Sequence, residues 1–458
     1  MFDYHTLIIG AGPAGTSCAL KLGRAGKKVG LIEKTAIGGV CLNRGCIPSK
    51  TYLYMVELLD CIKKAKRHGI EVAEPKVLWD QVQKRKETNV KVLGMGLTKE
   101  IEHAGVAIIT AEAKITGPNE VTLAGAEGQK KLTAEHIVFA PGSKSLFLPT
   151  IVRGEHVISS TEILDIPGVP QSLAIIGGGV TGVEMASVFL ALGTEVTIVE
   201  KQEALLPSQD REISANLKKA FEKKGCIIHL GAEVLSCADK DGQAQIIFKT
   251  SDGQEQTQAI SKALVVIGRA PNYDLKELET VGIEHNGRRI KLNEHLQTSV
   301  PSIYVTGDAG FLNLTAYGSE REGQVAAEHI LGNDRSIHYE HIMTTVFSHP
   351  EVAGIGLTEE QTKAKGIDYE VRRGDYAANA KAVIIGEREG MAKIIVEKAT
   401  QKILGVHMIG YHATELAHQA ILAVTHQLTV RDWLEVVWSH PVLSEVLKSA
   451  LEAPAEGG

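Results

Sequence analysis

The sequence has few cysteines, no long apolar run and no long basic run, and each absence excludes a class of protein. Six cysteines in 458 residues are too few for a secreted disulfide scaffold, so a close pair points to redox or metal chemistry. The longest apolar runs, such as 263–267, fall far short of the roughly 20 residues that span a bilayer. The 49 basic and 55 acidic residues include no basic run that could follow a phosphate backbone. Neither nucleic acid nor a membrane is therefore an expected partner.

The first residues carry no targeting pattern. Residues 1–5 contain no basic region followed by an apolar stretch, and a strand pattern begins at Thr6. Apolar residues make up 44% and charged residues 23% of the chain, as in an ordinary globular protein. We therefore expect a cytoplasmic protein of three or four domains, at roughly 100–150 residues each.

A glycine-rich turn follows the first predicted strand, 6–9. Its three glycines are Gly10, Gly12 and Gly15. A helix is predicted over 14–24, and a second strand over 29–32 leads to Glu33. In this context the first glycine makes the turn, the second admits a pyrophosphate and the third lets helix and strand pack closely. The helix N-terminus supplies amide donors, and Glu33 lies where an acid accepts hydrogen bonds from a ribose.

The same pattern returns near the middle of the chain. After a predicted strand over 173–176, the three glycines are Gly177, Gly179 and Gly182. A helix to Leu192 and a strand over 196–199 lead to Glu200, which, like the acid of the first copy, lies 23 residues after its first glycine. One such turn can serve packing alone, but two in register indicate two dinucleotides, most simply FAD and a nicotinamide dinucleotide. Glu200 predicts NAD, because a carboxylate there repels the 2′-phosphate of NADP.

Two cysteines, Cys41 and Cys46, follow the first glycine-rich turn. On a regular α-helix, side chains five residues apart point about 140° from each other, so the sulfurs could bond only if the turn is distorted. Gly45 and the pair 38–39 allow such a bend, and a helix predicted from near Pro48 would lower the thiolate pKa of a nearby cysteine. The alternative is that the two cysteines are free and buried or form half of a metal site. No second pair of Cys or His ligands follows at the spacing of a zinc site, however.

The segment 41–50, CLNRGCIPSK, resembles the active-site disulfide motif of the pyridine nucleotide-disulfide oxidoreductases, and the likeness runs essentially end to end. Within this family the chain is most similar to the dihydrolipoamide dehydrogenases. The resemblance implies an α/β fold with two Rossmann-like dinucleotide-binding domains and a C-terminal α+β dimerisation domain. It also implies a homodimer that uses FAD and NAD to oxidise dihydrolipoyl groups on a carrier domain of a 2-oxoacid dehydrogenase or glycine-cleavage complex.

The resemblance assigns roles to the redox residues. Cys41 would be the thiol that meets the substrate, and Cys46 the thiol beside the flavin. Lys50 would lie near the isoalloxazine and pair with Glu184; solvated helix faces are the alternative for both. Asp308, after the strand that begins at residue 303, would bind ribityl hydroxyls. Without the resemblance, a strand that ends in Thr-Gly-Asp indicates only a turn.

The resemblance also identifies an acid-base near the C-terminus. His440 would be that base, held by Glu445, and would reach the disulfide of the other subunit. A thiol needs such a partner, because the thiolate is the nucleophile and an imidazole can take and return its proton near pH 7. By itself His-Pro indicates only a turn.

The domain boundaries follow from the same likeness. Gly142 lies where the chain leaves the FAD domain, Gly268 where it returns from the NAD domain, and the block 345–356 resembles the opening of the interface domain. The predicted segments are 1–143 for the first part of the FAD-binding domain, 144–269 for the NAD-binding domain, 270–340 for the second FAD-binding part and 341–458 for the interface domain.

Five positions depart from the family pattern without touching the two thiols, the base or its carboxylate: Val40, Pro141, Tyr317, Trp438 and Val442. Together with Arg44, some of them could shape a pocket for another disulfide, so a glutathione reductase-like enzyme is the main alternative. Glu200 argues against it, since that relative usually takes NADPH. A mercuric reductase would need a C-terminal thiol pair, and no cysteine follows Cys237. A non-catalytic flavoprotein is the alternative of another class.

Overall fold

The computed structural model describes residues 1–125 and 128–457, which divide into two compact units. The first unit holds residues 1–51, 81–146 and 268–339. The second unit holds residues 52–80, 147–267 and those from Glu340 to the end of the described chain. Both α3 (Cys46–Lys64) and α4 (Trp79–His103) contain residues of each unit.

The first unit is built on a parallel sheet of order β3-β2-β1-β6, in which β17 also pairs with β6. Its strands are β1 (Tyr4–Ile9), β2 (Val29–Glu33), β3 (Ala107–Thr110), β6 (Gly128–Phe139) and β17 (Ile303–Val305). The long strand β6 also forms an antiparallel meander with β4 (Glu112–Gly117) and β5 (Glu120–Gly125). A short ribbon joins β7 (Ser143–Ser145) to β16 (Arg269–Pro271). Apolar residues fill the parallel strands because both sheet faces are covered.

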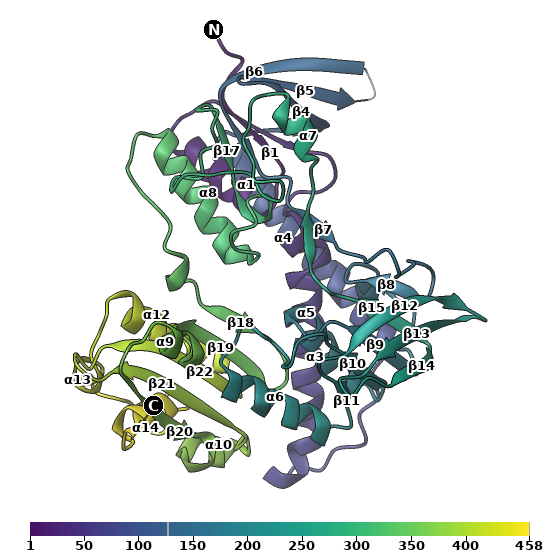
Figure 1. Cartoon of the computed structure of the whole chain (residues 1–458), viewed down its shortest axis with the longest axis vertical. Coiled ribbons are helices and arrows are strands. Elements are labelled where there is room, and N and C mark those ends of the chain that lie inside the picture. Colours follow the sequence, from purple (N-terminus) through teal and green to yellow (C-terminus); the bar gives the residue numbers. More distant parts are fainter. Residues whose placement is uncertain (126–127, 458) are drawn as a thin grey trace. The chain divides into compact units, whose positions relative to one another are not determined.

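Helices α1 (Pro13–Arg24) and α8 (Ala316–Ile330) pack against each other in the first unit, as Figure 1 shows. A glycine makes this close approach possible: a Cβ on Gly323 would lie only 2.1 Å from the carbonyl oxygen of Ala14. The remaining helices of the unit are α2 (Gly39–Arg44) and α7 (Leu275–Glu279). The backbones of α1 and α8 therefore touch where a side chain would hold them apart.

A buried acid on α8 fastens the turn that follows β17. Glu322 is fully buried, and its two carboxyl oxygens accept hydrogen bonds from the amide of Gly307 at 2.5 Å and from the hydroxyl of Tyr339 at 2.9 Å. Burial raises the pKa of Glu322 to about 7. Gly307 has a φ of +70° and opens the 3-10 turn that carries Asp308.

The second unit repeats the plan of the first. Its parallel sheet has the order β11-β10-β9-β15-β8, and a separate antiparallel meander joins β12, β13 and β14. The parallel strands are β8 (Val157–Ser159), β9 (Ser172–Ile176), β10 (Glu195–Val199), β11 (Ile227–His229) and β15 (Lys262–Val265). The meander strands and main helices are β12 (Glu233–Lys240), β13 (Gln243–Lys249), β14 (Glu255–Ile260), α5 (Val180–Ala191) and α6 (Arg211–Lys223).

The C-terminal part of the second unit is an antiparallel sheet of order β18-β19-β22-β21-β20-β23 with short helices. The strands are β18 (Thr344–Val346), β19 (Glu351–Gly356), β20 (Tyr369–Asp375), β21 (Gly390–Glu397), β22 (Ile403–Gly410) and β23 (Glu456–Gly457). The helices are α9 (Glu359–Ala364), α10 (Ala380–Ile385), α11 (Ala413–Leu416), α12 (His418–Thr425), α13 (Val430–Leu434) and α14 (Glu445–Glu452). Buried Lys393 on β21 lies 3.0 Å from Asp210 and 2.6 Å from Glu359, so its charge is paired.

The predicted fold class is confirmed, with two dinucleotide-binding folds followed by an α+β domain. The expected strands lie within a residue or two of their predicted bounds. The helix expected from near Pro48 instead begins at Cys46, because the chain turns at Gly45 and not after the cysteine pair.

Among residues 1–125 and 128–457, no helix is both long and apolar enough to cross a membrane. The three boundaries between the four predicted domain segments stay predictions.

Gly323→Ala is expected to lower the free energy of unfolding by about 1–3 kcal/mol, because the added methyl overpacks α1 against α8. Urea unfolding of the purified protein measures the change. Gly168→Ala is the control, since a Cβ at that exposed loop position meets nothing within 4 Å. Equal stability of the two variants would contradict the close approach.

Glu322→Gln is expected to change how stability depends on pH. Because burial raises the pKa of Glu322 from 4.5 to about 7, the folded protein holds this proton more tightly than the unfolded chain, and stability falls as pH rises through that window. The wild type is expected to lose on the order of 2–3 kcal/mol of its free energy of unfolding between about pH 5 and pH 8, and Glu322→Gln should not show this loss. Urea unfolding at both pH values tests it, with exposed Glu102→Gln as the control. Parallel pH profiles for the wild type and Glu322→Gln would refute the raised pKa.

Candidate active site

The cysteine pair lies at a break between two helices, as the spacing predicts. Helix α2 ends at Arg44 and α3 begins at Cys46, with Gly45 between them. A Cβ on Gly45 would lie 3.0 Å from the carbonyl oxygen of Val40 and 3.4 Å from the Cα of Cys41, so the chain folds back closely at this glycine. The break brings the side chain of Cys46 within hydrogen-bonding reach of Cys41.

The surroundings of the pair control the protonation of Cys41. Its hydrogen bond with the side chain of Cys46 and its burial both raise the pKa of the Cys41 thiol, while the positive charge of Lys50 lowers it. For Cys41 this is the opposite of the lowering expected from the N-terminus of the following helix, because the hydrogen bond with Cys46 and burial outweigh the favourable charge of Lys50. In the described part of the chain neither cysteine belongs to a cluster of three or more possible metal ligands, which argues against the metal-site alternative.

The first glycine-rich turn has the geometry that the fingerprint predicts. Gly10 has a φ of +102°, and a Cβ there would lie 2.2 Å from the carbonyl oxygen of Ala140. A Cβ on Gly15 would lie 1.9 Å from the carbonyl oxygen of Gly10, so helix α1 packs directly on the turn. Next to Gly12 there is room, since a Cβ would come no nearer than 3.9 Å, to the Cα of Gly39. A phosphate group of FAD could occupy this space beside the N-terminus of α1.

The second turn repeats each of these features. Gly177 has a φ of +113°, and a Cβ there would lie 2.5 Å from the carbonyl oxygen of Val266. A Cβ on Gly182 would lie 2.1 Å from the carbonyl oxygen of Gly177. A Cβ on Gly179 would meet nothing within 4 Å, which leaves room for a second pyrophosphate. The residues at both turns thus fit a dinucleotide.

The acid at the end of the second strand of each dinucleotide-binding fold accepts a hydrogen bond from its glycine-rich turn. Glu33 accepts from the amide of Ala11 at 2.9 Å and from the amide of Thr35 at 2.9 Å. Glu200 accepts from the amide of Gly178 at 2.5 Å and from the amide of Gln202 at 2.6 Å. The carboxylates therefore hold the turns, and their remaining lone pairs lie where the ribose of each dinucleotide is expected.

Asp308 is held by two partners that the sequence did not reveal. Its carboxylate accepts a short hydrogen bond from the hydroxyl of Ser143 and lies 3.6 Å from Nε of Arg269. Arg269 also donates to the backbone carbonyl of Ser143 at 2.9 Å. Ser143 and Asp308 meet because β6 pairs with β17, which sets the segments after the two strands side by side. Arg269 joins them because β7 pairs with β16, next to the predicted glycines Gly142 and Gly268, which have φ values of +73° and +134°. No sequence signal links Ser143 to Asp308, since a tertiary strand pairing brings them together.

His440 and Glu445 form a dyad at the start of α14. Nδ1 of His440 lies 3.1 Å from both carboxyl oxygens of Glu445, and the amide of Val442 donates to the same carboxylate at 3.1 Å. The Val442 amide and the His440 side chain lower the pKa of Glu445, so its carboxylate stays charged. The side chain of His440 is 68% exposed. Nδ1 can therefore donate to Glu445 while Nε2 stays available to take a proton.

The remaining predicted residues have varied surroundings. Glu184 is buried and accepts from the amide of Phe347 at 3.0 Å, so the alternative of a solvated helix face is wrong for it. Lys50 and Glu184 belong to different units, and their pairing stays a prediction. The indole of Trp438 packs against the core of the C-terminal domain, whereas Tyr317 is exposed.

Comparisons with known proteins agree with this site. Residues 4–329 match the model of the pyridine nucleotide-disulphide oxidoreductases, and residues 342–451 match the dimerisation domain of the same family. A dihydrolipoyl dehydrogenase of Bacillus subtilis is 35% identical over 97% of both chains. A mitochondrial dihydrolipoyl dehydrogenase of Arabidopsis thaliana is 35% identical over 98% of this chain and 90% of its own.

Solved structures with the same fold include LpdA from Mycobacterium tuberculosis and the HOCl-induced flavoprotein disulfide reductase RclA from Escherichia coli in a Cu(II) complex. LpdA is 26% identical with a TM-score of 0.89 and covers 97% of this chain and 98% of its own. RclA is 26% identical with a TM-score of 0.88 and covers 98% of this chain and 99% of its own. The family and its dihydrolipoyl dehydrogenase members imply FAD and NAD(H) as cofactors. The two glycine-rich turns, the cysteine pair and the family matches together show that the chain belongs to the pyridine nucleotide-disulphide oxidoreductases.

Proposed function

We propose that this protein is a dihydrolipoyl dehydrogenase, which oxidises dihydrolipoyl groups to lipoyl groups and reduces NAD⁺ through the disulfide of Cys41 and Cys46. The dyad of His440 and Glu445 carries the proposal, because an exposed imidazole held by a carboxylate at 3.1 Å is an acid-base suited to a thiol. Relatives named dihydrolipoyl dehydrogenase, aligned over almost the whole chain, support the choice of substrate.

The proposed reaction begins with proton transfer at Nε2 of His440. The imidazole takes the proton of one substrate thiol, and the thiolate attacks Sγ of Cys41, which breaks the disulfide and leaves the electron pair on Cys46. The second substrate thiol then attacks the first sulfur and gives its proton to the departing sulfur of Cys41, so the substrate leaves as a cyclic disulfide and Cys41 as a thiol. Charged Glu445 stabilises the imidazolium until His440 releases the first proton to solvent.

The remaining residues bind and orient the cofactors. Lys50, on α3 after the cysteine pair, lowers the pKa of Cys41 and pairs with Glu184 in the proposed enzyme. Asp308, fixed by Ser143 and Arg269, holds ribityl hydroxyls. Bound FAD would supply the two-electron carrier between the cysteine pair and NAD⁺.

The proposed working form is a cytoplasmic homodimer. The match to the family's dimerisation domain over 342–451 supports it, and so does the exposure of His440, which would be covered by the disulfide region of the second subunit. The lipoyl group would arrive on a carrier domain of a 2-oxoacid dehydrogenase or glycine-cleavage complex.

Reduction of a different disulfide with a nicotinamide dinucleotide is the second candidate. The likeness to the disulfide reductase RclA favours it, at 26% identity over nearly the whole chain. The two candidates differ in direction and in substrate, because a dehydrogenase consumes a dithiol and a reductase consumes a disulfide.

The purified holoenzyme is expected to reduce NAD⁺ with dihydrolipoamide and to oxidise NADPH with glutathione disulfide at least roughly 100-fold more slowly in kcat/KM. Absorbance of the nicotinamide measures both reactions. Faster turnover of glutathione disulfide than of dihydrolipoamide would reject the proposed function in favour of a disulfide reductase.

His440→Ala is expected to lower kcat for dihydrolipoamide oxidation by about 10²–10⁴-fold, because the substrate thiol loses its base. Reduction of the flavin by NADH should change little, since it needs no proton from the substrate. His426→Ala, at an exposed histidine of the same domain, is the matched control. Undiminished thiol oxidation in His440→Ala would show that another group is the base.

Glu200→Gln is expected to lower the ratio of kcat/KM for NADH over NADPH by roughly tenfold, because it removes the charge that repels a 2′-phosphate. The amide side chain keeps one oxygen for the turn amides of Gly178 and Gln202. Glu203→Gln, on the exposed segment that follows, is the control. A wild-type enzyme that prefers NADPH would contradict the assigned role.

A further inference from the structure

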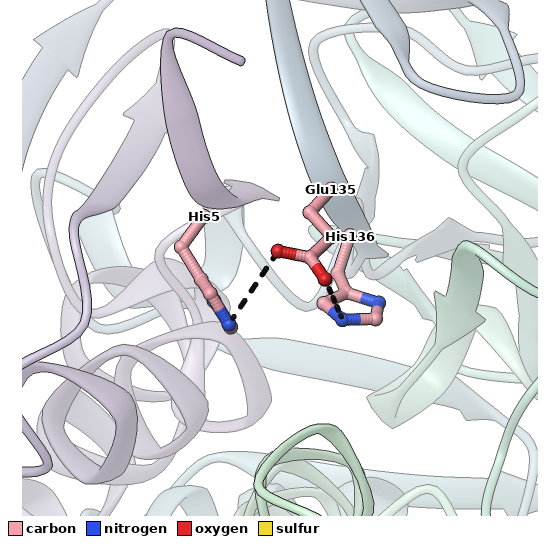
Figure 2. Close-up of side chains that lie close together, drawn as sticks. All are labelled: His5, Glu135 and His136. Carbon is pink, nitrogen blue, oxygen red and sulfur yellow. Dashed lines mark ion pairs between the residues drawn. The ribbon is translucent and has the colours of Figure 1, made fainter. Parts of the chain in front are cut away.

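Two histidines and one glutamate gather on neighbouring strands of the first unit, away from the cysteine pair. His5 lies on β1, and Glu135 and His136 lie on β6. The two strands are parallel, with Tyr4 paired to Ala134 and Thr6 paired to His136, so the register sets His5 beside Glu135. Figure 2 shows the three side chains pointing toward one another, with the carboxylate between the two rings. Sequence reasoning missed this cluster, since a distance of about 130 residues separates its two parts.

The cluster has the spacing of a metal site. Oε2 of Glu135 lies 4.0 Å from Nε2 of His5, and Oε1 lies 4.0 Å from Nε2 of His136. One ligand atom from each residue lies within 4.8 Å of the other two, and no other such group of three occurs in the described residues. The two imidazoles are largely covered, whereas 57% of the Glu135 side chain is exposed and free to adjust.

In each of the two imidazole rings, Nε2 is the nitrogen that is available to bind a metal ion. Nδ1 of His5 lies 2.9 Å from Oγ1 of buried Thr6, and when Nδ1 donates to this oxygen Nε2 carries the lone pair. Nδ1 of His136 is buried with no hydrogen-bond partner among the described residues, so Nε2 is its accessible nitrogen. An edge contact with Tyr304, at 6.1 Å between ring centroids, orients the ring of His136.

We propose that His5, Glu135 and His136 bind one Zn²⁺ ion. Tetrahedral zinc with bonds of about 2.0–2.2 Å places its ligand atoms roughly 3.4 Å apart, whereas the ligand atoms of the three residues lie within 4.8 Å of one another, so they need to approach by at most about 1.4 Å. The exposed Glu135 side chain can supply the movement of its own oxygen, and the two rings supply the rest. Two imidazoles and one carboxylate suit zinc, whereas magnesium and calcium take oxygen ligands. Three protein ligands leave the fourth position to water.

The position of the cluster indicates a stabilising role for the ion. His5 lies near the amino end of β1, five residues before Gly10, and a strand rises about 3.3 Å per residue, so the glycine-rich turn lies roughly 16 Å away. A zinc ion there would join β1 to β6 without touching the dinucleotide turn. Lys27 is a nearby cation whose charge acts on both imidazoles and opposes a bound metal.

Calorimetric titration of the FAD-loaded, oxidised protein with Zn²⁺ tests the proposal, because the oxidised pair offers no thiolate to the metal. The wild type is expected to bind one zinc ion per chain. His5→Gln, Glu135→Gln and His136→Gln should each weaken binding at least tenfold. The double variant Glu102→Gln/His103→Gln is the matched control, since it removes an adjacent acid and imidazole from the exposed end of α4 and should bind as the wild type does.

Thermal unfolding gives an independent measurement. Zn²⁺ should raise the melting temperature of the wild type and of the control but not of the three ligand variants, each of which first has to show a cooperative unfolding transition without zinc. Lys27→Gln should tighten zinc binding by about threefold, because it removes an opposing charge. Binding that survives all three ligand substitutions, or that disappears in Cys41→Ser/Cys46→Ser, would overturn the proposal. None of these outcomes depends on the proposed dehydrogenase activity.

Discussion

At three turns that follow parallel strands, a carboxylate accepts a hydrogen bond from a backbone amide of the turn, and the turns that are expected to hold the dinucleotides depend on this bond. Glu33 fastens the first glycine-rich turn through the amide of Ala11, and Glu200 fastens the second through the amide of Gly178. Glu322 does the same for the amide of Gly307, after β17. Each turn follows the carboxyl end of a parallel strand, where α/β folds bind ligands. The acids therefore preorganise the backbone amides that a ligand would meet.

In both glycine-rich turns the backbone of the turn also lies directly against the backbone of the helix that follows. The carbonyl oxygens of Gly10 and Gly177 would clash with a side chain at Gly15 and Gly182, and Gly323 lies equally close to Ala14. Such contacts explain why the two dinucleotide folds repeat so closely although they belong to different units. The sheet order around β1 matches that around β9, with the second strand on one side and the return strand on the other. The same backbone arrangement of strand, glycine-rich turn and helix therefore occurs twice in the chain.

The redox residues separate into groups that local chemistry prepares independently. The break at Gly45 brings Cys41 and Cys46 together, and the hydrogen bond with the neighbouring thiol and burial raise the pKa of Cys41. His440 is oriented by Glu445 yet mostly exposed, so it has the form of a base that still lacks its thiol. In the proposed reaction the substrate supplies that thiol, and the second subunit of the homodimer supplies the disulfide that the thiolate attacks. An exposed, oriented imidazole and a disulfide are the two parts that oxidation of a thiol needs.

The sequence alone determined the features that depend on residues close together along the chain. The glycines of both turns, the acids 23 residues later and the distorted cysteine pair are set by local backbone geometry. The dyad of His440 and Glu445 and the full fold class were predicted from the family resemblance that these motifs support. Tertiary structure alone decided what joins distant segments. Ser143 meets Asp308 because β6 pairs with β17, and Arg269 joins them because β7 pairs with β16. His5 meets Glu135 and His136 because β1 pairs with β6. Strand register places these side chains together, and register depends on the packing of the whole sheet, which no short motif encodes.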